Sequence, residues 1–141
     1  MATSREAEAW AAEARRRRGD DQDSLAAATA NAAAARRAGV TIAAGTDTQG
    51  PGMAFGRSLH RELALLVAAG LTPAEALRAA TAVPGAWLQA GAGLGTVTVG
   101  APADLVLVEG WPWERIEDLA RVRTVVQRGV VTALAAGSPR P

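Results

Sequence analysis

The sequence lacks cysteine and lysine and contains a single histidine, His60. Without cysteine, neither a disulfide framework nor a thiolate metal site is possible. With one histidine, a complete metal site is hard to build from this chain, because catalytic zinc sites ordinarily draw three protein ligands. A self-sufficient metal centre is therefore not expected.

Large aromatic side chains are also scarce. They make up 4% of a chain that is 49% hydrophobic, and alanine dominates the hydrophobic half. Such a composition buries little volume per residue for an independent domain. It favours a polypeptide that packs against something else.

Long apolar runs are missing as well. No uninterrupted run approaches the ~18 residues that cross a bilayer, and the first residues contain no hydrophobic region of a signal peptide. With 15 basic against 14 acidic residues, the charge implies neither nucleic acid nor an anionic membrane as a partner. Arginines 15–18 close a predicted helix over residues 4–18, and they are typical of a solvated helix end. We expect a cytoplasmic protein.

The N-terminal two thirds alternate between helix and strand. A helix is predicted over residues 24–38, a buried strand over residues 40–44 and a further helix over residues 59–69. The order α-β-α indicates an α/β fold with a parallel sheet. Next, Thr72 begins a capping box with proline at the first helical position, which predicts a helix through about residue 81.

The C-terminal third has the period of short strands. Pro84-Gly85 is expected to break or kink the preceding helix. Beyond it, alternating apolar residues predict strands over residues 96–99, 104–108, 123–127 and 130–132. An acidic stretch around residues 114–119, with helical character, connects the middle pair.

Asp47 is the leading candidate for a functional residue. It follows the predicted strand over residues 40–44 and is surrounded by small, turn-forming residues. At the carboxyl ends of parallel strands, side chains face the ligand crevice. By itself, however, the pattern more often marks an Asx-turn or a helix cap after a strand.

Other polar and aromatic residues have simpler interpretations. His60 is a candidate substrate contact, although a lone histidine at the start of a helix is more often a packing residue. Glu62 cannot share the helix face of His60, two residues away, and is interpreted as structural. Trp111 and Trp113 are expected to pack in a β-sandwich or an interface, and an exposed pair would indicate a partner surface.

Several short motifs occur together over residues 31–132, and their order and spacing resemble the amidohydrolase superfamily. The likeness is closest to the C-terminal third of imidazolonepropionase-like and prolidase-like metal-dependent hydrolases. The motifs are AAGTD at 43–47, SLHREL at 58–63, AGLTPAEAL at 69–77, AAT at 79–81, LGT at 94–96, GAPADLV at 100–106 and VVQRG at 125–129.

The resemblance implies an α/β fold in which the chain is the C-terminal fragment of a (β/α)₈ TIM-like barrel followed by strands of a small β-sandwich. Residues 40–44 would be the last barrel strand, and Asp104, at the start of a predicted strand, would be a turn and hairpin determinant. On this basis residues 1–23 form an unassigned helix and turn, 24–93 the terminal part of the barrel, 94–135 the β-sandwich portion and 136–141 a tail.

The resemblance also implies a function. Asp47 corresponds to the aspartate that binds the catalytic divalent metal, expected to be zinc, and acts as general base in hydrolysis of amide, lactam or peptide-like C–N bonds. The family's remaining ligands, histidines and a carboxylated lysine or glutamate, belong to barrel segments outside this chain. We therefore expect the isolated chain to be inactive and to bind no metal by itself. The alternative is a non-catalytic module or subunit that completes a barrel supplied by a second chain, or self-associates through an exposed barrel edge.

Overall fold

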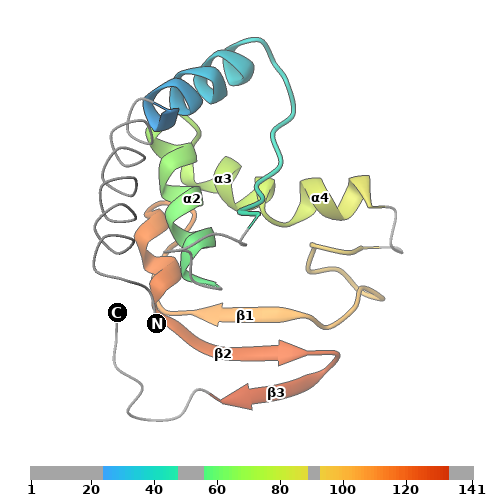
Figure 1. The fold of residues 1–141 in the computed structure, drawn as a ribbon. Helices are drawn as coiled ribbons and strands as arrows, with labels where there is room; N and C mark the ends of the chain where they lie inside the picture. The colour runs from blue at the N-terminus through green and yellow to red at the C-terminus, as the bar shows by residue number, and fades with distance from the viewer. Residues whose placement is uncertain (1–23, 48–55, 89–92, 134–141) are drawn as a thin grey trace, which may run out of the picture.

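The computed structural model describes residues 24–47, 56–88 and 93–133. A helix over residues 24–37 is followed by an irregular segment, three further helices and a three-stranded sheet (Figure 1). The elements are α2 (Arg57–Ala68), α3 (Pro73–Ala79), α4 (Ala82–Trp87), β1 (Leu105–Val108), the 3₁₀ helix η1 (Ile116–Ala120), β2 (Val122–Gln127) and β3 (Val130–Ala133). The predicted helix over residues 4–18, with its arginines, lies outside the described residues.

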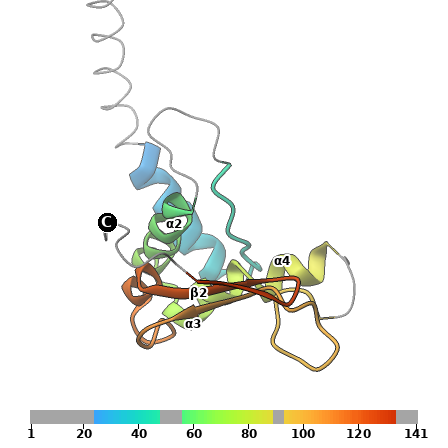
Figure 2. The same cartoon turned by 90° about the horizontal axis from the view of Figure 1, so that it is seen from below.

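The sheet is antiparallel, with strand order β1-β2-β3. It forms a single layer when it is seen edge-on (Figure 2), and β1 is the strand nearest the helices (Figure 1). These three strands match the sequence predictions over residues 104–108, 123–127 and 130–132. The described residues thus contain one small antiparallel sheet, and the predicted β-sandwich stays a prediction.

The hairpin between β2 and β3 depends on left-handed backbone at its two loop residues. Arg128 has φ 49° and Gly129 has φ 80°, as two-residue hairpin loops require. The Oδ1 atom of Asp104 accepts a hydrogen bond from the Arg128 backbone N–H at 2.7 Å. The interpretation of Asp104 as a hairpin determinant is confirmed, because its carboxylate ties this loop to the start of β1.

The core lies between α2, α3 and η1. Leu63, Ala76 and Ile116 are 2%, 0% and 4% exposed, and they form one buried cluster. Of these three residues, Ile116 comes from η1 in the β-rich C-terminal part of the chain. The cluster therefore joins the helices to the segment between β1 and β2, even though its members are far apart in the sequence.

The N-terminus of α3 has the predicted capping box. Thr72 Oγ1 accepts from the Glu75 backbone N–H at 3.2 Å, and Glu75 Oε2 accepts from the Thr72 backbone N–H at 2.7 Å. Glu75 also pairs with Arg36 of the first described helix at 3.1 Å. The backbone N–H of Thr72, followed by the Arg36 guanidinium, holds the pKa of the Glu75 carboxyl below its usual range.

The predicted strand over residues 40–44 is not formed among the described residues. No described strand pairs with this segment, which runs as irregular backbone. A parallel strand needs a neighbour to receive its hydrogen bonds, and here the Ala44 N–H is taken instead by the Ala79 carbonyl oxygen at 2.8 Å. The missing partner strand is the physical reason for the difference.

The predicted strand over residues 96–99 is wrong. Gly93, Gly95 and Gly100 all have positive φ, and the Thr96 N–H donates to the Gly93 carbonyl at 3.1 Å. Glycine in left-handed conformation favours turns. The apolar alternation in this stretch therefore lies on a glycine-framed loop instead of a sheet.

The helix break near Pro84 is also displaced from its predicted position. The chain leaves helical geometry at Thr81, and α4 begins at Ala82. Pro84 lies in the first turn of α4, where its missing N–H has no intrahelical partner to lose. Gly85 is needed for close packing, because a Cβ atom there would overlap the carbonyl oxygen of Leu94.

Asp118 organises the acidic stretch that connects β1 to β2. Its side chain is 2% exposed and accepts hydrogen bonds from the Trp111 backbone N–H at 3.0 Å and from Arg115 Nη2 at 2.8 Å. Arg121 Nη1 lies 3.5 Å away. The Trp111 N–H, followed by Arg115, holds the pKa of the Asp118 carboxyl below its usual range. This network fixes η1, and with it Ile116 of the core.

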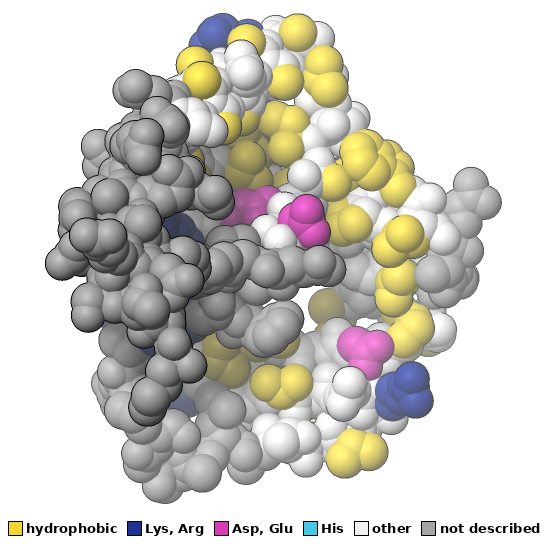
Figure 3. Space-filling view, in the orientation of Figure 1, with side chains coloured by type: hydrophobic (Ala, Val, Ile, Leu, Met, Phe, Trp, Pro, Cys, Tyr) yellow, Lys and Arg dark blue, Asp and Glu magenta, His cyan; other side chains and the backbone are white. Residues whose placement is uncertain are grey.

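Apolar side chains remain on the surface of this fold. They are spread over the face in Figure 3, and the exposed large ones include Val40, Trp87, Leu88, Val97, Val99, Val106, Leu107, Val130 and Val131. None of the helices in the described ranges has the length and hydrophobicity that a membrane span requires.

The Asp118 network predicts an acid-sensitive fold. Because the pKa of Asp118 is lower in the folded protein, its contribution to stability is complete above the unfolded-state pKa of ~3.9 and is lost as the pH falls through the folded-state value. Asp118→Asn should lower the unfolding free energy at pH 7 and make its decline below about pH 4 shallower. Urea unfolding between pH 7 and pH 2 measures both, with exposed Glu117→Gln as the control. Identical acid profiles for wild type and Asp118→Asn would contradict the prediction.

Candidate acid site at Asp47

The candidate site is built on the irregular segment over residues 40–47. Asp47 lies at its end, exposed, with φ 42°. Left-handed backbone is costly for most L-residues, but aspartate and asparagine tolerate it because their short side chains bond locally. Strained backbone clusters at functional sites, so the conformation favours a specific role for Asp47.

Two helices hold the segment just before Asp47. The Ala44 N–H donates to the Ala79 carbonyl oxygen of α3 at 2.8 Å. The Gly45 N–H donates to Oε1 of Glu62 on α2 at 2.6 Å. Ala44 also packs against the buried cluster of Leu63, Ala76 and Ile116. The backbone is therefore anchored at two consecutive residues by different elements.

The sequence indicates a structural role for Glu62. Its carboxylate accepts a hydrogen bond from the Gly45 backbone N–H, which is a structural contact. The contact itself was not predicted. It joins residues 17 positions apart, and no periodicity in the sequence indicates which side chain will meet a given backbone amide. Only the packing of α2 beside the segment places the carboxylate there.

His60 is half-buried in the first turn of α2. Its predicted contact with substrate stays a prediction. In the part of the chain that the structure describes, no three His, Cys, Asp or Glu side chains are grouped so that they could hold a metal ion. The donor set that these residues offer does not fit a complete metal centre, and Asp47 can contribute one carboxylate to such a centre.

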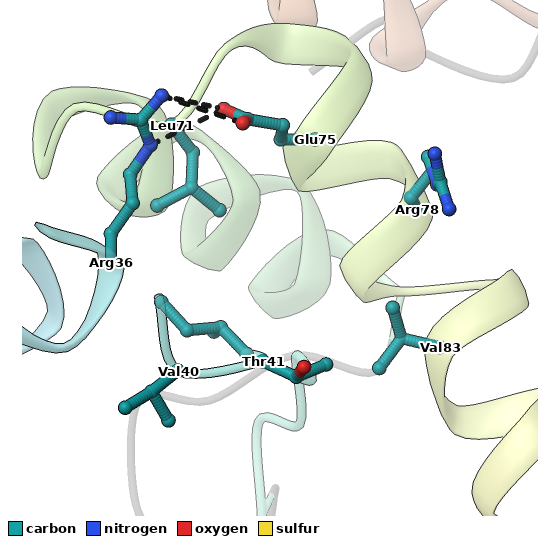
Figure 4. A pocket seen from close by; sticks show the side chains of 8 residues that line it. Arg36, Val40, Thr41, Leu71, Glu75, Arg78 and Val83 are labelled. Carbon is teal, nitrogen blue, oxygen red and sulfur yellow. Dashed lines mark hydrogen bonds and ion pairs between the residues drawn. The ribbon is translucent and has the colours of Figure 1, made fainter. Parts of the chain in front are cut away.

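A hollow of about 190 Å³ lies beside the start of the same segment (Figure 4). In Figure 4, Arg36 and Glu75 point toward each other at one side of it, whereas Arg78 stands apart on α3. The lining residues are Arg36, Val40, Thr41, Ile42, Leu71, Glu75, Arg78 and Val83. No pattern in the sequence indicates this hollow, which lies beside the backbone of residues 40–42.

Trp111 and Trp113 form an exposed pair. Their rings meet edge to face, with centroids 5.3 Å apart and planes at 84°, and the residues are 61% and 50% exposed. Both residues are thus at least half exposed among the described residues, and the partner surface expected for an exposed pair stays a prediction.

The described elements define a class: an α/β protein in which a carboxylate ends a segment held between two helices, followed by a small antiparallel sheet. The chain belongs to the amidohydrolase family, whose model matches residues 10–137. The fold of this family is of the TIM-barrel type. The described α/β part with its three-stranded sheet therefore corresponds to one portion of such a protein.

Solved structures support the same family. A Xaa-Pro dipeptidase with bound methionine is 30% identical, covers 74% of this chain and has a TM-score of 0.67. An amidohydrolase is 28% identical over 72% of the chain, with a TM-score of 0.60. A prolidase complexed with N-methylphosphonate-L-proline is 36% identical over 70%, with a TM-score of 0.51. The match spans about a quarter of each of these proteins, 25%, 25% and 24%. Among curated proteins, none matches the chain.

The backbone of Asp47 predicts which substitutions the fold tolerates. Asp47→Asn should change the unfolding free energy by less than ~0.5 kcal/mol, as for an exposed polar exchange. Asp47→Val should lower it by ~1–3 kcal/mol, because a β-branched residue is strained at positive φ. Chemical denaturation of the two variants measures the difference. Equal stabilities would show that the left-handed conformation places no constraint on this position.

Proposed function

We propose that this chain is the C-terminal part of a metal-dependent amidohydrolase that hydrolyses amide, lactam or peptide-like C–N bonds. In the complete enzyme Asp47 is a metal ligand and the general base. The observation that carries the proposal is the placement of Asp47: an exposed carboxylate in left-handed backbone, two residues beyond an anchored pair of amides. The family match over residues 10–137 supports it.

The chemistry assigned to this chain is that of a single carboxylate. A divalent ion, zinc in this proposal, lowers the pKa of bound water toward ~7. Asp47 is suited to accept a proton and return it to a leaving amine, because it is exposed and its backbone is held in place. The remaining ligands would come from outside the described residues, among which no three His, Cys, Asp or Glu side chains are grouped around a possible metal position.

The solved relatives suggest which substrates to test first. One is described as a Xaa-Pro dipeptidase and another as a prolidase with a phosphonate analogue on proline. Dipeptides with a C-terminal proline are therefore the first substrate class for the complete enzyme, and N-acyl amino acids and lactams are the next.

The test compares zinc binding and hydrolysis by the isolated chain with hydrolysis by a completed enzyme. Alone, the chain should bind Zn²⁺ weakly in calorimetry and release no product from a Xaa-Pro dipeptide. Combined with the part of the Xaa-Pro dipeptidase that it does not cover, it should support hydrolysis, and Asp47→Asn should lower kcat by about 10²- to 10⁴-fold. Tight zinc binding with turnover by the isolated chain, or full activity of Asp47→Asn, would contradict the proposal.

A second candidate is a non-catalytic module that completes a barrel supplied by a second chain. The observation that favours it is the segment over residues 40–44. It has no partner strand among the described residues, and a hollow lined by Val40, Thr41 and Ile42 lies beside it. An unpaired edge with apolar side chains is a template for strand addition.

The same edge predicts association of the isolated chain. Light scattering at increasing concentration should show dimers or larger species, because Val40 is exposed and no described strand pairs with residues 40–44. Val40→Lys should shift the distribution toward monomer, since a charge on an edge blocks pairing. Val97→Lys, at an exposed valine on the loop between Gly95 and Gly100, is the matched control. A wild-type chain that stays monomeric at high concentration would refute the prediction.

A further inference from the structure

The two amides that anchor the Asp47 segment differ in the kind of acceptor they use. The Ala44 N–H bonds to a backbone carbonyl, Ala79 O on α3, at 2.8 Å. The Gly45 N–H bonds to a side-chain carboxylate, Oε1 of Glu62, at 2.6 Å. A hydrogen bond to a carboxylate is shorter and roughly twice as strong as one between neutral groups. The second anchor is thus the stronger one, and it is the nearer one to Asp47.

Glu62 is itself held on a rigid element. It is half-buried on α2, and the next residue, Leu63, is 2% exposed in the cluster with Ala76 and Ile116. The packing of Leu63 fixes the rotation of α2, and this rotation directs Glu62 toward the segment. Functional groups are positioned best by such supported side chains on helices or strands.

We propose that Glu62 is a positioning residue for Asp47: its carboxylate fixes the Gly45 peptide and thereby aims the Asp47 side chain two residues further on. This inference rests on the proposed function of Asp47 and assigns Glu62 no contact with substrate. It explains how an irregular segment, without strand neighbours among the described residues, keeps left-handed backbone at Asp47.

The consequence of losing Glu62 is local. Without its carboxylate, the Gly45 N–H has no acceptor from α2, whereas the Ala44 N–H keeps its bond to Ala79. The segment that leads to Asp47 then loses its contact with α2 at Gly45. A displacement of ~1 Å at a reacting group can cost on the order of 10²-fold in rate, so Asp47 would lose alignment while the core stays intact.

Hydrogen exchange of the two neighbouring amides tests the contact directly in the 141-residue chain. Glu62→Ala should speed exchange at Gly45 by about tenfold or more and leave Ala44 unchanged. Glu62→Gln, which keeps an oxygen acceptor, should give an intermediate rate at Gly45. Glu114→Ala removes an exposed carboxylate elsewhere and should change neither amide. Equal acceleration at both amides, or none at Gly45, would overturn the proposal.

The effect of Glu62 on catalysis is tested with the enzyme formed by this chain and the part of the Xaa-Pro dipeptidase that the chain does not cover. Glu62→Ala should lower kcat by about 10- to 100-fold, as for other supports of metal ligands, with KM changed less than about threefold and part of kcat recovered in Glu62→Gln. If Asp47→Asn abolishes activity but Glu62→Ala retains wild-type kcat, the positioning role is wrong and the proposed function stands. If Asp47→Asn retains activity, the proposed function fails, and the exchange rates at Gly45 alone decide whether Glu62 holds this peptide.

Discussion

The contact on which the described fold depends is the packing of Leu63, Ala76 and Ile116 between α2, α3 and η1. In an alanine-rich chain with few aromatic side chains, little apolar volume is available for a core. The structure concentrates it at one point, where each of three elements contributes one residue. Ala76 is small enough to let α2 and α3 approach closely, and Ile116 extends the cluster into the β-rich half.

The candidate site depends on the same packing. Glu62 and Ala79 receive the two amides of the Asp47 segment, and they belong to the helices that Leu63 and Ala76 hold together. A change in the core would therefore alter the direction of Asp47. The Asp118 network supports the same core from the β-rich part of the chain, because it fixes η1 and thus the position of Ile116.

The fold also leaves much apolar surface uncovered. The segment over residues 40–44, the hollow beside it, the exposed tryptophans and several valines on the strands would be costly in an isolated domain. The chain spans about a quarter of the solved amidohydrolases that it matches. In the proposed function, the further ligands for Asp47 and the packing of this exposed apolar surface would both come from the rest of such a protein.

The sequence by itself determined the family, the helices up to Ala79, the capping box at Thr72 and the hairpin around Gly129, because these depend on short-range patterns: periodicity, caps and turn residues. It also identified Asp47 as the candidate residue. Tertiary structure decided where residues 40–44 and 96–99 depart from strand geometry, since a strand exists only when a neighbour accepts its hydrogen bonds. It alone placed Glu62 on Gly45 and Asp118 between Trp111 and Arg115. Such contacts depend on how helices rotate and pack, and no local pattern contains that information.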